Sequence, residues 1–364
     1  MPAFKPLHTL AVSAFACSLL LPPALHSFDS SAAKTAPAQT ALEREVRADM
    51  NFLASDELHG RGSATRDEHL AALFAASQFE ALGLQPGGDN GTFLQRAALP
   101  SPLPTRLQQR IEKYEDTPRK ETWNAIGILR GSTLPNEVVL LTAHLDHLGI
   151  GPAVNGDTIY NGADDDASGT TAVLALARLL ATGQRPHRTI VFALFGSEEI
   201  GGFGNRAFLQ HPPVPLSNIV ANLEFEMIGR PDPAVPAGTL WLTGFDRSNL
   251  GPELAKHGAH LVNDPHPKEQ FFQRSDNYAL ARQGIIAHTV SSFGLHTDYH
   301  QPSDEIRTID FAHMAKAIAS MAGPVRWLAD TDWKPEWNPG KNPEQGSPGA
   351  APANPTQPGK TQPK

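Results

Sequence analysis

The chain has 364 residues, of which 40% are hydrophobic and 19% are charged, and a chain of this size and composition can bury a full core. Its formal net charge of −8, without any basic stripe, argues against nucleic acid as a partner. The single cysteine is Cys17, near the N-terminus, so we expect neither a disulfide nor thiolate chemistry in the folded domain.

Residues 1–30 have the pattern of a secretory signal peptide. Lys5 precedes a short apolar run that two prolines interrupt, and a polar stretch rich in small residues follows. The run is too short and too broken to span a bilayer. We therefore predict a mature protein without a transmembrane span and with a periplasmic or secreted location. Cys17 matches a bacterial lipobox poorly, so lipid anchoring is not expected.

The middle of the chain alternates helical and strand patterns. In chain order these are two helices within 41–85, strands at 122–130 and 138–143, a helix at 170–183, a strand at 189–196, and helices at 248–260, 276–283 and 310–328. A helix between two buried strands is typical of a β-α-β unit. The pattern predicts one α/β domain over residues 41–330, with a mostly parallel central sheet flanked by helices.

Residues 331–364 differ in composition from the rest of the chain. They are rich in Pro, Gly, Asn, Gln and Lys and nearly free of branched aliphatic side chains. Such a segment cannot offset its ordering entropy by burial. We predict a disordered tail over Thr331–Lys364.

Polar side chains that bind metals follow successive apolar runs. The clusters are AHLDH (143–147), GADDDASG (162–169), SEE (197–199), EFEMIGR (224–230) and HTDYHQPSD (296–304). The carboxyl ends of parallel strands meet at one edge of a sheet, where such folds bind ligands. Imidazole and carboxylate groups together suit a hydrolytic site in which one carboxylate bridges two metal ions.

Each cluster also has a plainer interpretation. His144 and Asp146 point to the same side of an extended chain, which suits a metal-binding histidine held by a carboxylate, or else a structural histidine at a turn. The repulsion within Asp164–Asp166 would be relieved by a cation, although an acidic cap on a solvated loop is the alternative. Glu198 and Glu199 diverge, so one can bind metal while the other faces water, but exposed glutamates at strand ends are common.

Taken together, the motifs resemble those of a known family. AHLDH, GADDDASG, FGSEEIGGFGN, NLEFEMIGR, QRSDNYAL and YHQPSDEI are similar, in this order, to the motifs of the M28 family of zinc aminopeptidases, the group with the bacterial leucyl aminopeptidases. NFLASDELHGRGS near the N-terminus is similar as well, so the resemblance covers roughly residues 42–328. It implies the zinc-dependent exopeptidase (phosphorylase/hydrolase-like) fold, an eight-stranded mixed sheet flanked by helices with two zinc ions at its edge.

The resemblance also implies a role for individual residues. It places His144 on the first zinc and Asp165 as a bridge between both. Glu199 and His300 would bind the second zinc, and Glu198 would be the general base.

Three further roles follow from the resemblance. Glu226 stands where the family has aspartate and would bind the first zinc, with Glu224 on the same side of the strand as a competitor. Tyr299 matches a tyrosine that hydrogen-bonds the scissile carbonyl in some members, or it packs against the rim of the site. Arg274 matches an arginine near the substrate, or it pairs with Asp276.

The implied function is an exported aminopeptidase with two Zn²⁺ per chain that removes N-terminal residues from peptides. Three alternatives remain open. They are a single-zinc acyltransferase like the glutaminyl cyclases, a non-catalytic binding domain of the same fold, and a carboxypeptidase or amidohydrolase on the same site. The sequence indicates neither the side-chain preference nor the oligomeric state.

Overall fold

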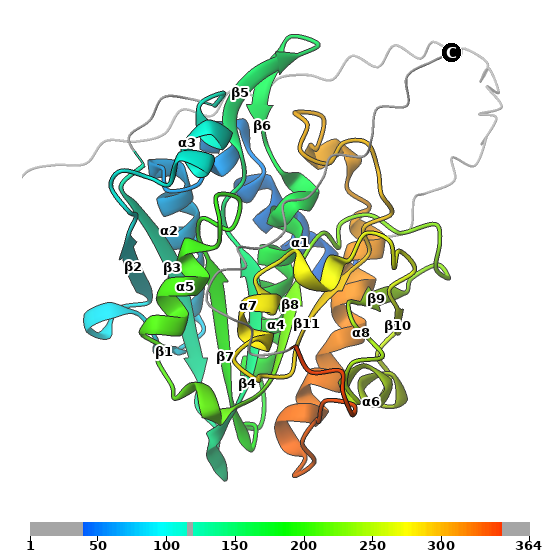
Figure 1. Ribbon diagram of the computed structural model, residues 1–364. Coiled ribbons are helices and arrows are strands. Elements are labelled where there is room, and N and C mark those ends of the chain that lie inside the picture. The colour runs from blue at the N-terminus through cyan, green and yellow to red at the C-terminus, as the bar shows by residue number, and fades with distance from the viewer. Residues whose placement is uncertain (1–38, 115–118, 344–364) are drawn as a thin grey trace, which may run out of the picture. The chain divides into compact units, whose positions relative to one another are not determined.

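The computed structural model describes residues 39–114 and 119–343 (Figure 1). The predicted signal peptide, with Cys17, lies outside these residues. The helices are α1 (Ala41–Leu53), α2 (Arg66–Ala81), α3 (Thr105–Ile111), α4 (Gly169–Ala181), α5 (Phe203–Gln210), α6 (Leu250–Lys256), α7 (Asn277–Ala281) and α8 (Phe311–Asp330). None of the helices in the described part of the chain has the length and apolar character needed to cross a membrane.

A mixed β-sheet forms the centre of the fold. Its strands are β1 (Gln85–Pro86), β2 (Leu94–Ala98), β3 (Glu121–Leu129), β4 (Leu134–His144), β7 (Arg188–Phe195), β8 (Ile219–Phe225), β9 (Leu240–Leu242), β10 (Leu261–Asn263) and β11 (Ala287–Ser291). The order across the sheet is β1-β3-β7-β4-β8-β11-β9-β10, and β2 also pairs with β3. Strands β7, β4, β8 and β11 are parallel to one another, whereas β3 and β9 run antiparallel to their neighbours β7 and β11. The predicted α/β fold with a mixed sheet is confirmed.

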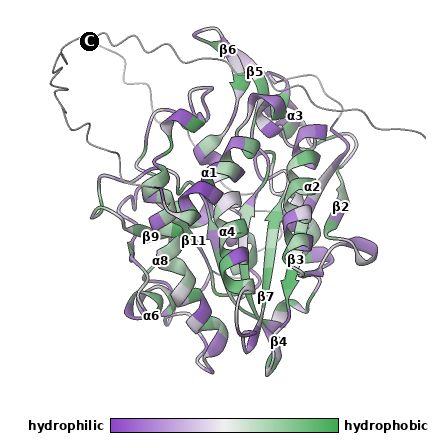
Figure 2. Ribbon diagram, turned by 180° about the vertical axis from the view of Figure 1, so that it is seen from behind, coloured by the Kyte–Doolittle hydropathy of each residue, from purple (hydrophilic) through white to green (hydrophobic). Residues whose placement is uncertain are grey.

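The sheet is buried on both faces because its strand residues alternate between two cores. In β4, Val139 and Leu141 pack in the core on the side of α1, α2, α4 and α8, whereas Val138 and Leu140 pack in the core on the side of α5 and α7. Figure 2 shows the first group of helices in front of the sheet, and Figure 1 shows α5 and α7 on the opposite face. A separate two-stranded ribbon, β5 (Gly149–Val154) and β6 (Asp157–Tyr160), follows β4.

The beginning of the predicted tail is ordered against the domain, which corrects the prediction. Trp337 forms a β-bridge with Ser248, and its ring lies 5.5 Å from that of His288. Lys341 is 3.0 Å from the carboxylate of Asp246. Composition missed this because a few large aromatic side chains suffice to anchor a polar segment. Residues 344–364 of the predicted tail lie outside the described residues.

Candidate metal centre

Four parallel strands end at the edge of the sheet where the polar clusters meet. β4 ends at His144, β7 at Phe195, β8 at Phe225 and β11 at Ser291, and the residues that follow these ends converge. Two groups of side chains lie there within ligand distance. The first donor group is His144, Asp165 and Glu226, and the second donor group is His147, Asp165, Glu199 and His300.

Two of the three adjacent aspartates are held by structural contacts. Asp164 accepts the main-chain N–H of Gly229 at 2.8 Å and lies 2.9 Å from His296 Nε2. Asp166 accepts main-chain N–H groups from three segments, at residues 144, 169 and 227. These two carboxylates therefore fix the loop before α4 against the strand ends.

Asp165, the middle aspartate, belongs to both donor groups. Its Oδ1 lies 3.1 Å from His144 Nε2, and its Oδ2 lies 3.1 Å from His300 Nε2. Its main-chain N–H donates to Asp304 at 3.1 Å, and the peptide bond to Asp166 is cis. The two oxygens of this one carboxylate thus face different sets of ligand atoms.

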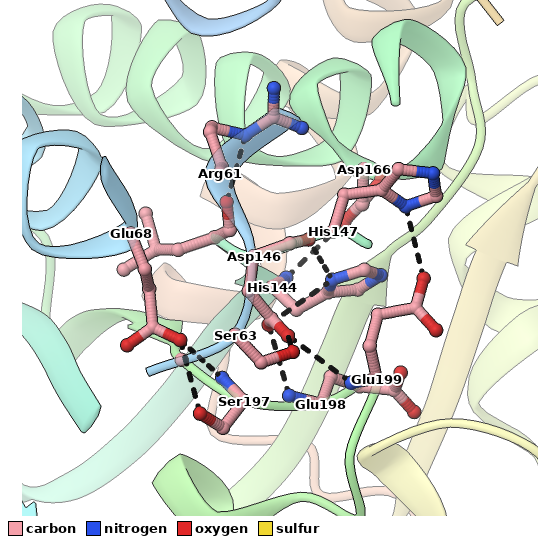
Figure 3. A network of polar contacts seen from close by, with 12 residues as sticks. Arg61, Ser63, Glu68, His144, Asp146, His147, Asp166, Ser197, Glu198 and Glu199 are labelled. Atoms are coloured by element: carbon pink, nitrogen blue, oxygen red, sulfur yellow. Dashed lines mark hydrogen bonds and ion pairs between the residues drawn. The ribbon is translucent and has the colours of Figure 1, made fainter. Parts of the chain in front are cut away.

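The second donor group surrounds one oxygen of Glu199. Glu199 Oε1 is 3.1 Å from His300 Nε2 and 3.0 Å from His147 Nδ1, a contact seen in Figure 3. Glu199 Oε2 points elsewhere, to the guanidinium of Arg110 at 3.3 Å. The carboxylate therefore offers a single oxygen to the site.

Charges within the second donor group compensate one another. Burial alone would lower the pKa of His300, but Glu199 and Asp165 raise it to about 9. Burial would raise the pKa of Glu199, but His300 and His147 hold it well below its usual range. The protonated imidazole of His300 thus takes the place that a cation would take beside these carboxylates.

In the first donor group, the ring of His144 is fixed mainly by the main chain. Its Nδ1 lies 3.0 Å from the main-chain oxygen of Asp146 and 3.7 Å from a carboxylate oxygen of the same residue. The nearer partner is therefore the carbonyl and not the carboxylate that the sequence suggests. The carboxylate of Asp146 instead accepts the N–H groups of Glu198 and Glu199, at 2.9 and 3.3 Å.

Glu226 belongs to the first donor group, and Glu224 does not. Glu224 Oε2 accepts the main-chain N–H of Asn277 at 2.5 Å. Burial and the nearby Asp276 raise the pKa of Glu224 well above its usual range, which favours its neutral form. Its position outside both donor groups and its hydrogen bond to Asn277 make Glu224 the poorer candidate for a metal.

The donor atoms of both groups fit zinc. Atoms bound at about 2.0–2.2 Å to a tetrahedral zinc ion lie about 3.3 Å from one another, close to the 3.0–3.1 Å contacts here. His144 Nε2, His147 Nδ1 and Glu199 Oε1 are buried, yet none has a hydrogen bond to a described residue. Each of these atoms lies among the ligand atoms of its own donor group and has no such hydrogen bond, as a metal ligand requires. The ligand roles themselves stay predictions.

Glu198 lines an open pocket of about 290 Å³ beside both donor groups. Burial raises the pKa of its carboxyl well above its usual range, and the neighbouring Glu199 adds to the shift. Ser197, just before it, has a φ of 57°, a conformation that L-residues rarely adopt. The chain therefore turns sharply after β7, and both Glu198 and Glu199 line the pocket.

The two predicted substrate-binding residues line the same pocket. The ring of Tyr299 stacks on His300 with 3.9 Å between centroids and lies 5.4 Å from that of Phe293. The guanidinium of Arg274 lies 4.8 Å from the ring centre of Phe271 and 3.5 Å from a carboxylate oxygen of Glu269. The ion-pair partner of Arg274 is thus Glu269 and not Asp276.

A closed polar network supports the centre from the side of α2 (Figure 3). Besides the two N–H groups of Glu198 and Glu199, the Asp146 carboxylate accepts the hydroxyl of Ser63 at 2.5 Å. Arg61 is 1% exposed and donates only to main-chain oxygens, those of residues 53, 145, 161 and 162. This arginine connects three segments, which are α1, the residues after β4, and the start of the loop with Asp164–Asp166, here called the aspartate loop.

Sequence reasoning passed over three residues of the centre. His147 is in the AHLDH motif, Arg61 is in the segment NFLASDELHGRGS, and Asp304 is in the YHQPSDEI motif. The sequence patterns predict no role for any of the three. A second histidine three residues after a predicted ligand was the available signal for His147. Apart from Leu53, the acceptors of Arg61 lie 84 to 101 residues away in sequence, and Asp304 accepts from Asp164, 140 residues away. A single chain carries no local signal for such contacts.

The family follows from comparison with known proteins. The model of Peptidase family M28 matches residues 124–323, more than half of the chain, and the chain belongs to this family. This confirms the family that the motifs indicate. The matching segment contains every residue of the two donor groups.

Individual relatives match shorter parts of the chain. An aminopeptidase of Pseudomonas aeruginosa is 38% identical over 115 residues, 31% of this chain and 19% of that protein. Human carboxypeptidase Q is 32% identical over 141 residues, 38% of this chain and 25% of that protein. The chain thus spans about a fifth to a quarter of the length of these relatives. A solved zinc aminopeptidase from Bacillus subtilis has the same fold, with a TM-score of 0.59 and 17% identity over 80% of this chain and 96% of that one.

Proposed function

We propose that the protein is an aminopeptidase that holds two zinc ions, one in each donor group, and removes N-terminal residues from peptides. The position of Asp165 carries the proposal. Its two oxygens each lie 3.1 Å from a histidine of a different donor group. A carboxylate between two sets of ligands is what a shared two-metal site requires. The similarity to the Pseudomonas aminopeptidase supports the substrate class.

The side chains of the pocket supply the acid–base chemistry. Zinc held by these donor groups would polarise the substrate carbonyl and lower the pKa of an attacking water. Glu198 accepts the proton of that water and delivers it to the leaving amine. Burial raises the pKa of Glu198, which makes its carboxylate a stronger base than a glutamate in water. The hydroxyl of Tyr299 donates to the carbonyl oxygen as negative charge develops there.

The lining of the pocket suits a free N-terminus with an apolar side chain. Carboxylates including Glu198, Glu199 and Glu226 present negative charge to a substrate α-amine. An apolar cluster lines the same pocket. It is formed by Met227, Trp241, Phe271 and Phe293, which pack together around the pocket. Apolar first residues should therefore be preferred.

A carboxypeptidase is the second candidate because four arginines line the same pocket. These are Arg110, Arg206, Arg274 and Arg282. Guanidinium groups bind carboxylates in a bidentate manner, as recognition of a C-terminus would require. The similarity to human carboxypeptidase Q points the same way. We place it second because Arg110 is already paired with Glu199 and Arg274 with Glu269.

The other two alternatives fit the centre less well. A single-zinc acyltransferase needs only one set of ligands, whereas here two sets share Asp165. A non-catalytic binding domain has no need of a general base, yet Glu198 lies in the pocket beside both donor groups.

The test combines metal content with a paired substrate panel. We expect elemental analysis to give about two zinc ions per chain and chelation to abolish hydrolysis. Aminoacyl-p-nitroanilides with apolar residues should be cleaved, and their N-acetylated counterparts should not. Full activity without metal would refute the proposal. Cleavage of N-blocked peptides from a free C-terminus, without aminopeptidase activity, would establish the second candidate instead.

We further propose that the protein is exported, with residues 1–30 as the signal peptide. Lys5 and the short apolar run that follows it support this. Expression in a Gram-negative host followed by fractionation tests it. Mature protein should appear in the periplasm with a new N-terminus after residue 26, and a lipid adduct on Cys17 or retention of the full chain in the cytoplasm would contradict it.

A further inference from the structure

His147 is held in the second donor group by its main chain. Its N–H donates to the carbonyl of Arg61 at 3.0 Å, and its carbonyl accepts the N–H of Ser63 at 3.2 Å. These two bonds form a short parallel bridge between the segment after β4 and the loop before α2. The direction of the side chain is therefore set by backbone pairing and not by its contacts with Glu199.

The ring of His147 lies against a position that must be glycine. A Cβ atom on Gly162 would come within 2.5 Å of His147 Cγ, and Gly162 has a φ of +58°. The aspartate loop can pass beside the imidazole only because this side chain is absent. The ring is fully buried, with 0% exposure, so Nδ1 has a fixed position 3.0 Å from Glu199 Oε1 and 3.8 Å from Asp165 Oδ2.

Neither ring nitrogen of His147 has a hydrogen bond to any residue that the structure describes. The fully buried His288 is a contrast, because its Nε2 contacts Ser248 at 2.8 Å and its Nδ1 contacts the carbonyl of Thr243 at 2.7 Å. A buried imidazole whose nitrogens make no hydrogen bond loses the free energy of hydration that they had in water, and the contact of Nδ1 with Glu199 is an ion-pair contact without hydrogen-bond geometry. A metal ion at the second donor group would supply the missing partner.

We propose that His147 is a fourth protein ligand of the metal in the second donor group, bound through Nδ1. This inference rests on the proposed two-metal function and deepens it. The two metal positions are then unequal, since the second has Asp165, Glu199, His300 and His147, and the first has only three protein ligands. The second metal should bind more tightly, and the first should keep more positions open for water and substrate.

The test measures metal affinity and not activity. Metal-free protein is titrated with zinc against a chromophoric chelator, and with cobalt, whose visible absorption reports the number and geometry of ligands. For the wild type we expect two binding steps, the tighter at the second donor group. Loss of His147 should weaken that step by more than the roughly 10–100-fold typical for loss of an outer partner of a ligand, and it should change the cobalt spectrum.

A series of variants identifies the ligand atom. Asn at position 147 places a polar atom near the position of Nδ1, and Gln places one near that of Nε2. The affinity of the tighter zinc-binding step should therefore be highest in the wild type, lower in His147→Asn, and lowest in His147→Gln and His147→Ala. His288→Gln is the matched control, since it replaces an equally buried histidine whose partners are known, and it should keep both steps.

The outcomes separate the inference from the proposed function. A wild type that binds no metal would refute both. A wild type with two metals, together with unchanged affinities and cobalt spectrum in His147→Gln and His147→Ala, would refute the role of His147 alone. The circular dichroism of the metal-free variants, compared with metal-free wild type, shows that they are folded. If His147→Ala does not fold, the order of wild type, His147→Asn and His147→Gln decides the question.

Discussion

Two buried glutamates flank Asp146 and have opposite surroundings (Figure 3). Glu68, on α2, accepts five hydrogen bonds, from residues 64, 122, 123 and 197. Glu199 is almost as buried, but its Oε1 accepts no hydrogen bond within the described residues. Both side chains are acidic and both lie next to Ser197 or Glu198, so neither residue type nor location explains the difference.

The difference separates scaffold from site. A buried charge is tolerated when hydrogen bonds or an opposite charge compensate it. The polar groups of Glu68, Asp146 and Arg61 are satisfied by hydrogen bonds within the protein, which gives the strand ends a fixed shape. The donor groups around Asp165 and Glu199 are compensated mainly by one another, with Arg110 on the other oxygen of Glu199, and Glu199 Oε1 remains free to bind a cation. The predictions below test this division.

The largest expected effect is on catalysis at Glu198. Glu198→Gln removes the proton acceptor without removing a ligand, so we expect both metals to stay and kcat to fall about 10³-fold or more. Elemental analysis and steady-state kinetics check this. Glu199→Gln is the matched control and should lose metal. If instead Glu198→Gln releases metal and Glu199→Gln keeps it, the two roles must be exchanged.

In the compensated network, the largest loss of stability should follow Arg61→Met. Four main-chain oxygens lose their donor, and the nearby Asp146 and Asp166 lose a cation. We expect the free energy of unfolding of the metal-free protein to fall by about 3 kcal/mol or more. Denaturant unfolding measures it. Arg66→Met, at an exposed arginine on α2, should change it by no more than about 0.5 kcal/mol, and equal effects would contradict the role of Arg61.

Two glutamates on either side of Phe225 compare a carboxylate that belongs to a donor group, Glu226, with one that belongs to neither, Glu224. Glu226→Ala should weaken metal binding in the first donor group by about 100-fold or more and leave the second group loaded. Glu226→Asp should still bind two metals, because a ligand remains. Glu224→Ala should keep both. If Glu224→Ala loses a metal while Glu226→Ala retains two, Glu224 is the ligand.

The smallest effect concerns His288, a compensated histidine far from the donor groups. Burial lowers its pKa to about 4, so below pH 6.5 the unfolded chain binds more protons than the folded one. Stability is then lost as the pH falls from 6.5 toward 4, by about 2 kcal/mol between pH 7.5 and 5 from this group alone. Unfolding curves of metal-free wild type and His288→Asn across this range measure it. The variant should lose less stability on acidification, and parallel pH profiles would rule out the contribution.

Much of the fold could be predicted because its signals are local. The apolar run 189–196 agrees closely with β7 (Arg188–Phe195), and the helical pattern 310–328 agrees with α8 (Phe311–Asp330). A buried strand needs continuous apolar residues, and these are visible in one chain. Since parallel strands end at a shared edge, the sequence also placed His144, Glu199 and Glu226 near one another.

The remaining features depend on contacts distant in sequence. Whether His147 faces the donor groups is decided by pairing with residues 61–63, more than 80 positions earlier. Trp337 is ordered by packing on His288 and Phe272, which no local composition reveals. The pairing of Arg274 with Glu269 instead of Asp276 depends on a loop whose path the sequence does not define.

The aspartate loop is held by two residues that are far apart in sequence, Arg61 and Asp304, and this has a consequence for biosynthesis. Gly162 is held by Arg61, which the ribosome has already made, whereas the N–H groups of Asp164 and Asp165 are held by Asp304, made about 140 residues later. The carboxylate of Asp165 therefore reaches its final position only after residue 304 has been made. A metal site that contains Asp165 would be completed after all strands of the central sheet have been synthesised.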